Sequence, residues 1–226
     1  MSDRVFNYIS NWKKGWGMPI KRPKHLLIIG GGVFQVPAIK TAKSMGLKVA
    51  VTDYNPEAEG MLLADYPIEV STRNINLTVN TAKQFHSTCA LDGVMTVGTD
   101  ASQTVAAVAD ALGIPGIPFE VAERATDKIK MRQVLKEKGV PVPKFRPIWT
   151  LDECQEAVKH MPLPLVIKPC DNMGARGVRK IEGHDDLIPA FREAKEASIS
   201  GKLILEEFMA GPELSLDALV FEGDIH

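Results

Sequence analysis

A short polar segment that follows an apolar run has the residue types that bind phosphate. The run 165–167 ends at Lys168, and the loop beyond it carries Gly174, Arg176 and Gly177 before a second strand begins. Glycines let backbone N–H groups turn toward a phosphate with no Cβ in the way, and the two cations add positive charge. The segment predicts a phosphate-binding flap, although a solvated β-hairpin has a similar composition. It is not a Walker A loop, because no Gly-Lys-Ser/Thr follows the glycines.

A second glycine-rich turn follows the first apolar run of the chain. Gly30, Gly31 and Gly32 stand between that run and an expected helix, and Asp53 ends the next expected strand. An acidic residue roughly 20 positions after such a turn is typical of dinucleotide-binding βαβ units. Gln35, however, occupies the place of the third glycine of that fingerprint. NAD(P) binding by an oxidoreductase is therefore kept as an alternative hypothesis.

Polar side chains also follow the third expected strand. Thr99, Asp100 and Ser102 are residue types that cap helices, which is their commonest structural role. They also lie at the carboxyl end of a parallel strand, where α/β sheets bind ligands. We take Asp100 as the first candidate for substrate contact, together with Thr99 and the turn residues Gly31 and Gly32.

The composition of the chain excludes several classes of function. The 226 residues have a formal net charge of −1, which gives no support to a nucleic-acid partner. The three cysteines are too few and too scattered for a disulfide framework or a zinc site, and the five histidines show no metal-binding spacing. No apolar run approaches the about 18 residues that cross a membrane. A cytoplasmic protein without a membrane partner is expected.

Strands and helices alternate along most of the chain, which indicates an α/β fold with a parallel sheet. A cluster of glycines and prolines at 113–118 marks the clearest boundary. The expected strands are 26–29, 47–52, 93–97, 165–168, 202–208 and 214–221, and the expected helices are 77–85, 102–112, 126–139, 151–160 and 186–197.

The end of the chain suggests an incomplete sheet. Residues 222–224 have the composition of a hairpin turn, yet the sequence stops at His226, where the second strand should run. A one-armed hairpin leaves an open sheet edge. We therefore expect a fragment of a longer protein, or one completed by another chain.

The order of four motifs resembles the ATP-grasp superfamily, which includes biotin carboxylase, carbamoyl phosphate synthetase and amino-acid ligases such as D-alanine–D-alanine ligase. Asp127-Lys128 precedes a helix that ends in Gly-Val-Pro at 139–141, and Val-Ile-Lys-Pro at 166–169 precedes the flap. Glu-Glu-Phe-Met-Ala-Gly-Pro-Glu follows at 206–213. The resemblance covers residues 25–226 and is specific because the motifs occur in order.

The resemblance implies four parts: a basic N-terminal arm (1–24), a Rossmann-like pre-ATP-grasp domain (25–118), a small ATP-grasp subdomain (119–205) and the start of the large one (206–226). It also implies the ATP-binding residues. Two lysines and the flap would hold the phosphates, and the hinge after the flap would read the adenine and ribose. The matching positions are Lys128, Lys168, Gly174, Arg176 and Gly177 for the phosphates, Glu206 (side chain), Glu207 and Met209 (backbone) for adenine, and Glu213 for ribose.

The resemblance further implies an ATP-dependent ligase that activates a carboxylate as an acyl phosphate and couples it to an amine or similar nucleophile, both small molecules. A flap that is not all glycine favours an amino-acid-ligase-like or carbamoyl-phosphate-synthetase-like branch. The Mg²⁺ ligands of the family are expected beyond His226, so we assign no catalytic or metal-binding residue, and the 226 residues alone are expected to be inactive. A homodimer is possible. A non-catalytic nucleotide-binding half-protein is the other alternative.

Overall fold

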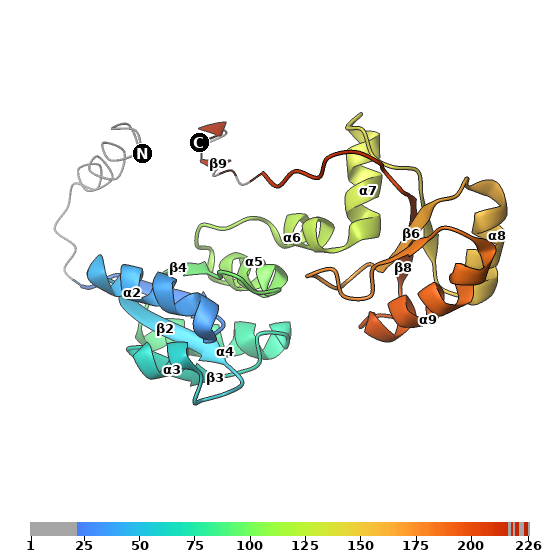
Figure 1. The fold of residues 1–226 in the computed structure, drawn as a ribbon. Coiled ribbons are helices and arrows are strands. Elements are labelled where there is room, and N and C mark those ends of the chain that lie inside the picture. Colours follow the sequence, from blue (N-terminus) through green and yellow to red (C-terminus); the bar gives the residue numbers. More distant parts are fainter. Residues whose placement is uncertain (1–21, 217, 219, 222–223, 226) are drawn as a thin grey trace. The chain divides into compact units, whose positions relative to one another are not determined.

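The computed structural model describes residues 22–216, 218, 220–221 and 224–225 (Figure 1). The chain separates into two compact units, residues 1–122 and 123–226. Most of the predicted basic arm and the predicted turn residues 222–223 lie outside the described residues.

The first unit is built on a parallel sheet with the strand order β3-β2-β1-β4. The central strand β1 is His25–Ile29, and Leu27, Ile28 and Ile29 are fully buried on both of its faces. Burial on both faces is typical of parallel sheets that helices cover on each side. The predicted α/β class with a parallel sheet is confirmed. The other strands are β2 (Lys48–Asp53), β3 (Tyr66–Glu69) and β4 (Leu91–Met95).

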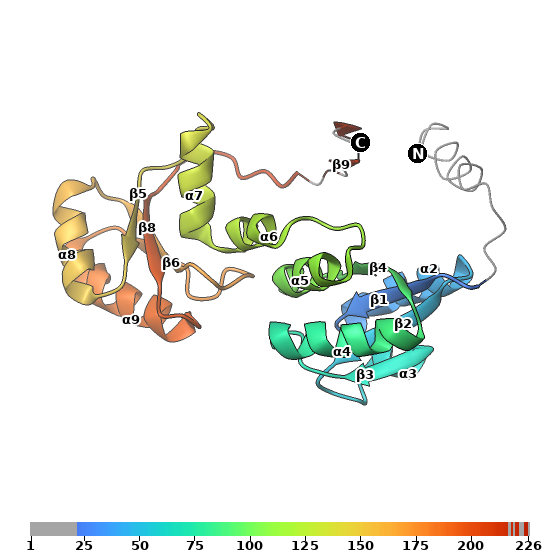
Figure 2. The same ribbon diagram turned by 180° about the vertical axis from the view of Figure 1, so that it is seen from behind.

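Helices cover both faces of this sheet. α2 (Val36–Ser44) and α3 (Glu59–Leu63) contribute Ile39 and Met61 to the core on one face. α4 (Ile75–Thr88) and α5 (Ser102–Leu112) contribute Ala82 and Val108 to the core on the other face. Figure 2 shows the sheet between these two helix pairs. A single 3-10 turn, η1 (Val33–Gln35), separates the glycine turn from α2, and α6 (Phe119–Thr126) spans the division between the units.

The second unit has an antiparallel sheet with the strand order β5-β8-β6-β7. Its main core lies between this sheet and the helices α8 and α9, where Leu187, Ala190, Phe191 and Ala194 of α9 are buried. α7 lies on the other face, where Ile129 packs with Cys170, Ile204 and Phe145. The elements are α7 (Lys128–Glu137), β5 (Phe145–Ile148), α8 (Leu151–His160), β6 (Leu165–Pro169), β7 (Arg179–Ile181), η2 (His184–Asp186), α9 (Leu187–Ala197) and β8 (Leu203–Glu207).

The last predicted strand is much shorter than expected. Among the described residues of the range 214–221, only Val220–Phe221 forms a strand, β9, which pairs antiparallel with β10 (Asp224–Ile225). Leu214 and Leu216 are 88% and 90% exposed, so neither packs in a core. The apolar side chains of Leu214 and Leu216 therefore do not form the buried face of a strand, contrary to the prediction.

Candidate functional site

The first lysine of the predicted site stands at the start of a capped helix. Asp127 is the N-cap of α7, and its carboxylate accepts hydrogen bonds from the backbone N–H groups of Ile129 and Lys130 at 2.9 and 3.1 Å. The N–H of Lys128 donates to the carbonyl of Cys170, at the base of the flap, at 3.2 Å. The helix start is thus tied to the end of strand β6, and Lys128 is held beside the flap.

The second lysine shares a sheet face with a buried glutamate. Glu206 on β8 pairs with Val166 on β6, so its side chain lies on the same face as that of Lys168, two residues along β6. The ammonium of Lys168 forms an ion pair with Oε2 of Glu206. Ile167 lies in the opposite core under α8 and α9. Val166 lies on the same face of the sheet as Glu206 and Lys168.

Arg132 completes this cluster. Its Nε donates to Oε1 of Glu206 at 2.6 Å, so each oxygen of the carboxylate holds one cation. The side chain of Glu206 is only 4% exposed, while those of Lys168 and Arg132 are 18% and 23% exposed. Arg132 lies one helical turn after Lys128 on α7. A buried carboxylate between two partly buried cations therefore joins α7 to the sheet.

The two lysines converge. Burial lowers the pKa of Lys128 below its usual range, and the nearby charge of Lys168 lowers that pKa further. Nearby Glu206 and Asp171 offset part of the effect. The Nζ of Lys128 donates to the carbonyl of Asn172, in the flap, at 2.6 Å. Both predicted phosphate lysines thus lie at one site, next to the flap.

Hydrogen bonds fix the base of the flap. The carboxylate of Asp171 accepts from the hydroxyl of Ser198 at 3.0 Å and from the backbone N–H groups of Ile199 and Ser200. Burial alone would raise the pKa of Asp171, but these hydrogen bonds outweigh it and hold the pKa below its usual value. The amide of Asn172 donates to the carbonyl of Ala197 at 3.0 Å. The flap is therefore anchored to the end of α9.

The two flap glycines have different roles. Gly174 and Gly177 both have a positive φ, of 68° and 70°, which favours glycine. A Cβ on Gly177 would lie 2.5 Å from that of Ala197, so this glycine also permits close packing against α9. A Cβ on Gly174 would meet open space. The Nε of Arg176 donates to the carbonyl of Met173 at 3.1 Å, within the flap. Gly174 is thus the glycine whose backbone a ligand could approach.

The predicted hinge residues follow Glu206 directly. The backbone N–H of Glu207 donates to the carbonyl of Lys144 at 2.9 Å, which ties the end of β8 to the segment before β5. Met209 and Glu213 are exposed in the segment after β8. The ring of Phe208 lies 4.3 Å from the ammonium of Lys180. The structure places Glu207 and Met209 beside the cluster along the chain, but it shows no contact of Glu213 with the cluster.

The glycine turn of the first unit is filled by the protein itself. The N–H of Gly31 donates to the carboxylate of Asp53 at 2.8 Å, and its carbonyl accepts from Gly60 of α3 at 2.6 Å. The buried side chain of Gln35 donates to the carbonyl of Val97 at the end of β4. These contacts give the glycines, Asp53 and Gln35 a structural role where strand ends meet α3.

The other substrate candidates lie at the same sheet edge. Thr99 lies near Gly30, since a Cβ built on that glycine would be 3.5 Å from Cγ2 of the threonine. α5 has Ala101 at its N-cap and no side-chain cap, so the capping role considered for Thr99, Asp100 and Ser102 is not found. These side chains remain candidates for substrate contact.

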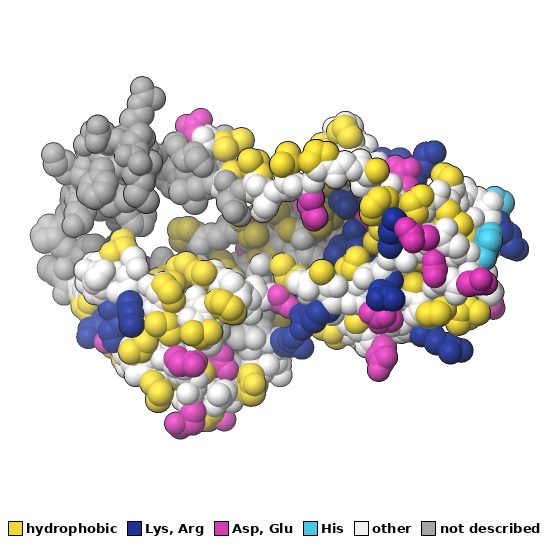
Figure 3. Space-filling view, in the orientation of Figure 1, with side chains coloured by type: hydrophobic (Ala, Val, Ile, Leu, Met, Phe, Trp, Pro, Cys, Tyr) yellow, Lys and Arg dark blue, Asp and Glu magenta, His cyan; other side chains and the backbone are white. Residues whose placement is uncertain are grey.

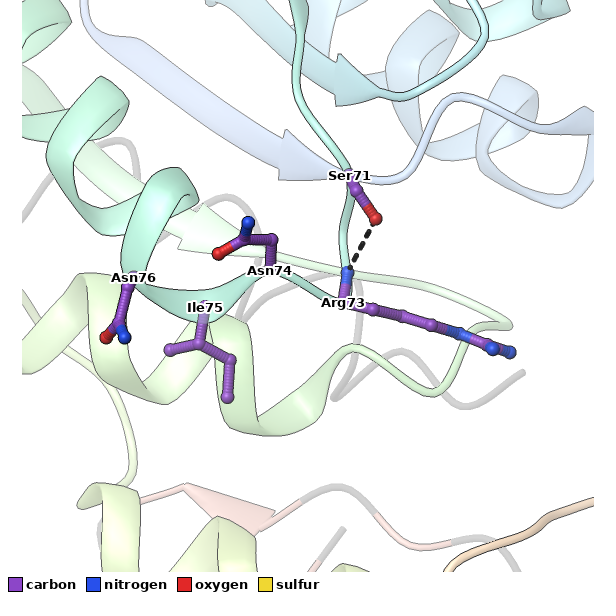
Figure 4. A pocket seen from close by; sticks show the side chains of 5 residues that line it. All are labelled: Ser71, Arg73, Asn74, Ile75 and Asn76. Atoms are coloured by element: carbon purple, nitrogen blue, oxygen red, sulfur yellow. Dashed lines mark hydrogen bonds between the residues drawn. The ribbon is translucent and has the colours of Figure 1, made fainter. Parts of the chain in front are cut away.

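A shallow pocket of about 600 Å³ lies in the first unit, where β3 leads into α4. Figure 4 shows that its side chains do not converge: that of Arg73 extends away from those of Ile75 and Asn76. Asn74 is engaged as the N-cap of α4, accepting from the N–H of Leu77 at 3.1 Å. This pocket offers no group of side chains suited to a reaction.

The surface and the acidic residues exclude further classes of site among the residues that the structure describes. On the face drawn in Figure 3, basic and acidic side chains are interspersed over the second unit, with no large surface of one sign. No group of three or more His, Cys, Asp or Glu side chains there could hold a metal ion. Within the same described ranges, every helix is too short or too polar to span a membrane.

Sequence reasoning missed Arg132. Its distance of four residues from Lys128 puts both side chains on one face of α7, so helical spacing was the available signal. The signal is weak, because four of the ten residues of α7 are basic: Lys128, Lys130, Arg132 and Lys136. Only the position of α7 over β8 shows which of them reaches Glu206.

Family models match both halves of the chain. Residues 125–226 match the ATP-grasp domain family. Residues 16–103 match the family described as the alanine dehydrogenase/PNT C-terminal domain. The candidate site lies within the first of these matches.

Individual proteins agree with the ATP-grasp match. A D-alanine–D-alanine ligase of Ectopseudomonas mendocina is 28% identical over 109 residues, which cover 46% of this chain and 34% of the ligase. The L-amino acid ligase of Bacillus licheniformis superposes with a TM-score of 0.73 and 26% identity, over 92% of this chain and 50% of that one. The ADP complex of N5-carboxyaminoimidazole synthetase from Staphylococcus aureus has a TM-score of 0.67 at 19% identity, over 84% and 48% of the two chains, and shows the fold alone.

The chain spans about a third of the length of the curated relatives and half that of the similar solved structures. The fold of both units, the ATP-grasp match and the similarity to ligases agree with one another. Residues 125–226 of the chain therefore match the ATP-grasp domain family.

Proposed function

We propose that residues 123–226 bind ATP, with Lys128 and Lys168 at its phosphates and the flap covering them. The observation that carries this proposal is the convergence of the two lysines beside Asn172 and the flap. Burial and the nearby charge of Lys168 lower the pKa of Lys128, so holding this ammonium charged costs free energy in the absence of an anion. A polyphosphate relieves that repulsion and accepts charge-assisted hydrogen bonds from both.

The charges of the cluster favour the same kind of ligand. Lys128, Lys168 and Arg132 supply three positive charges, whereas Glu206 and Asp171 supply two negative ones. The oxygens of Asp171 are occupied by the turn at 198–200. The net positive charge therefore faces the flap and suits a phosphate chain.

The adenine and ribose contacts extend the proposal along the hinge. Val166 would line one side of the purine, with Met209 as the other apolar contact. The carbonyl of Glu207 and the backbone of Met209 would bond the base, and Glu213 would accept from the ribose hydroxyls. Glu206 already holds two cations, but each of its oxygens keeps a second lone pair for the exocyclic amine.

We infer further that the whole protein is a ligase. A carboxylate oxygen of the substrate attacks the γ-phosphorus of ATP, the bond to the β-phosphate oxygen breaks, and ADP leaves. An amine then attacks the carbonyl carbon of the acyl phosphate and releases phosphate. The lysines would balance the charge of the transferred group, and the flap would keep water away from the acyl phosphate. Among the described residues, no group of three or more His, Cys, Asp or Glu side chains could hold a metal ion, so we assign no residue of this chain to Mg²⁺.

Similarity to D-alanine–D-alanine ligases and to an L-amino acid ligase supports an amino acid as the carboxylate substrate. The sheet edge with Gly32, Thr99 and Asp100 is the proposed contact region of the first unit. A second small molecule would serve as the nucleophile. A homodimer and a cytoplasmic location remain predictions from the sequence.

Isotope transfer tests the ligase chemistry. The protein is incubated with ATP, Mg²⁺ and a set of amino acids whose carboxylates carry ¹⁸O. An acyl phosphate transfers one ¹⁸O atom to the released phosphate, which mass spectrometry detects. Label in AMP instead would indicate an acyl adenylate and would contradict the proposal. ATP binding without release of ADP would indicate that these 226 residues hold the nucleotide but lack the rest of the active site.

Nicotinamide dinucleotide binding is the second candidate, favoured by the family match of residues 16–103. The contacts of the first unit support it less, because Gly31 and Asp53 already bond each other and η1 separates the turn from α2. Titration with NADH separates the two candidates: binding of NADH without binding of ATP would favour the oxidoreductase.

A further inference from the structure

Arg132 links α7 to the sheet through a short ion pair, and the sequence gives it no role in the proposed nucleotide site. Its guanidinium bonds Oε1 of Glu206 at 2.6 Å, while Lys168 occupies Oε2 of the same carboxylate. All three side chains are mostly buried, so solvent screens their charges little. The state of Glu206 thus affects Lys168 directly.

The net charge that Lys168 and its partners present to a phosphate depends on whether Glu206 pairs with Lys168 alone or also with Arg132. A carboxylate that faces one ammonium alone cancels its charge, and such a pair attracts a phosphate weakly. A carboxylate shared with a second cation leaves one net positive charge in the group. Because Arg132 is charged at every accessible pH, it can supply that second charge permanently.

We propose that Arg132 is a positioning residue for the phosphate contact: by holding one oxygen of Glu206, it leaves Lys168 able to turn from the carboxylate to the nucleotide. This inference rests on the proposed binding of ATP at Lys168. Arg132 acts through Glu206 and does not touch the phosphates.

The place of Arg132 on α7 adds a second consequence. Lys128 begins the same helix one turn earlier, and its N–H is bonded to the base of the flap. The bond from Arg132 to Glu206 therefore fixes α7 over β8. It thereby holds Lys128 and Lys168 in a fixed position relative to each other. A lysine in place of the arginine would keep the charge but present a single point donor with no planar fork.

A double-mutant cycle on the 226-residue protein tests the proposal. The affinity for ATP is measured by titration calorimetry for the wild type, R132M, E206Q and the double variant R132M/E206Q. R132M should weaken ATP binding about tenfold or more, because Lys168 then stays paired with Glu206 and its charge-assisted contact with the phosphates is lost. In the E206Q background the same change should have less than half of that effect, since a neutral side chain no longer competes for Lys168.

Two further variants complete the design. R132K should recover part of the affinity that R132M loses, because it restores the charge. K136M removes a positive charge from an exposed position one turn further along α7 and should leave ATP binding unchanged. Circular dichroism checks the fold of each variant. If R132M alone fails to fold, the double variant, which leaves no orphaned carboxylate, is compared with E206Q and should bind ATP almost equally.

The outcomes separate this inference from the proposed function. An equal loss from R132M in both backgrounds would mean that Arg132 contacts the phosphates itself, and it would overturn the positioning role. Unchanged affinity in R132M would do the same while leaving ATP binding intact. Absence of ATP binding by the wild type would overturn the proposed function and this inference together.

Discussion

Glu206 is the residue whose surroundings decide the character of the site. Its carboxylate is almost fully buried, and such a charge is tolerated only when its partners compensate for the lost hydration. Arg132 and Lys168 do so from two different elements. Removal of either partner would leave a poorly compensated charge, so the cluster couples the stability of the second unit to the geometry of its lysines.

Lys128 gives the site a dependence on pH. Burial and the charge of Lys168 set the pKa of Lys128 below 10.5, the usual lysine value, and a bound phosphate would raise that pKa again. ATP binding should therefore take up a proton once the pH exceeds the pKa of the free protein. The affinity for ATP should fall as pH rises toward 10.5, by at most about tenfold per pH unit for one proton.

The variant K128R is the comparison for this prediction, because an arginine stays charged over the whole range. Its affinity for ATP, measured by calorimetry at the same pH values, should change less than that of the wild type. Parallel pH profiles for the two proteins would show that Lys128 does not titrate at the nucleotide.

At the level of single residues, the sequence singled out Lys128 and Lys168 but did not show which carboxylate lies beside them. The pair Glu206-Glu207 is visible in the sequence, yet composition does not tell which carboxylate is buried. The register of β8 against β6 decides this, because it puts Glu206 on the face of Lys168. Register is set by the whole sheet, which a local pattern does not contain.

Among the elements, the flap is the one whose mobility matters for the proposed reaction. Its base is fixed by Asp171 and Asn172 against the end of α9, whereas Gly174 faces open space. A rigid base with an open tip suits a segment that closes over a ligand and reopens. The anchor at Asp171 therefore sets how much of the flap can move.

The variant D171N should loosen this anchor. Because hydrogen bonds hold the pKa of Asp171 below 3.8, its stabilising contribution is present above that pH and is lost as the pH falls through the lowered value. At neutral pH the loss should be about 1–3 kcal/mol, and it should disappear in acid. Hydrogen exchange of the Ile199 and Ser200 amides measures it. Equal protection in D171N, the wild type and the exposed control D185N would contradict the prediction.

Sequence reasoning missed two edge strands and a short helix, for different reasons. β3 and β5 are edge strands of four residues, and each contains a proline, Pro67 or Pro147. A proline lowers the expectation of a strand, although an edge strand tolerates it because one side makes no ladder hydrogen bonds. α3, with five residues, is too short to show a helical period. The longer helices and the central strands were predicted within a few residues.

For the whole molecule, two units with different sheets share one chain. The parallel sheet of the first unit uses its glycine turn and Asp53 for its own packing, and the cation cluster lies within the second unit. The α/β class could be predicted because apolar runs typical of strands alternate with helical patterns along the chain. The prediction that Leu214–Phe221 forms a full strand was wrong, because apolar alternation alone does not supply a partner strand.

ATP should therefore protect the two units unequally. A ligand held by Lys128, Lys168 and the flap slows local opening where it binds. Hydrogen exchange with saturating ATP and Mg²⁺ should fall at 127–132, 166–178 and 204–209, with little change at 25–112. Protection centred on the turn at 30–32 would instead favour a dinucleotide site in the first unit.

The most direct test of the nucleotide site is the affinity for ATP of the variant K168M, measured by titration calorimetry beside the wild type. The control is K159M, which removes the same charge from an exposed position on α8. Loss of one charge-assisted contact costs about 1.5–3 kcal/mol, so K168M should bind ATP roughly tenfold to a hundredfold more weakly, and K159M should bind like the wild type. Equal affinity for ATP in K168M and the wild type would contradict the account.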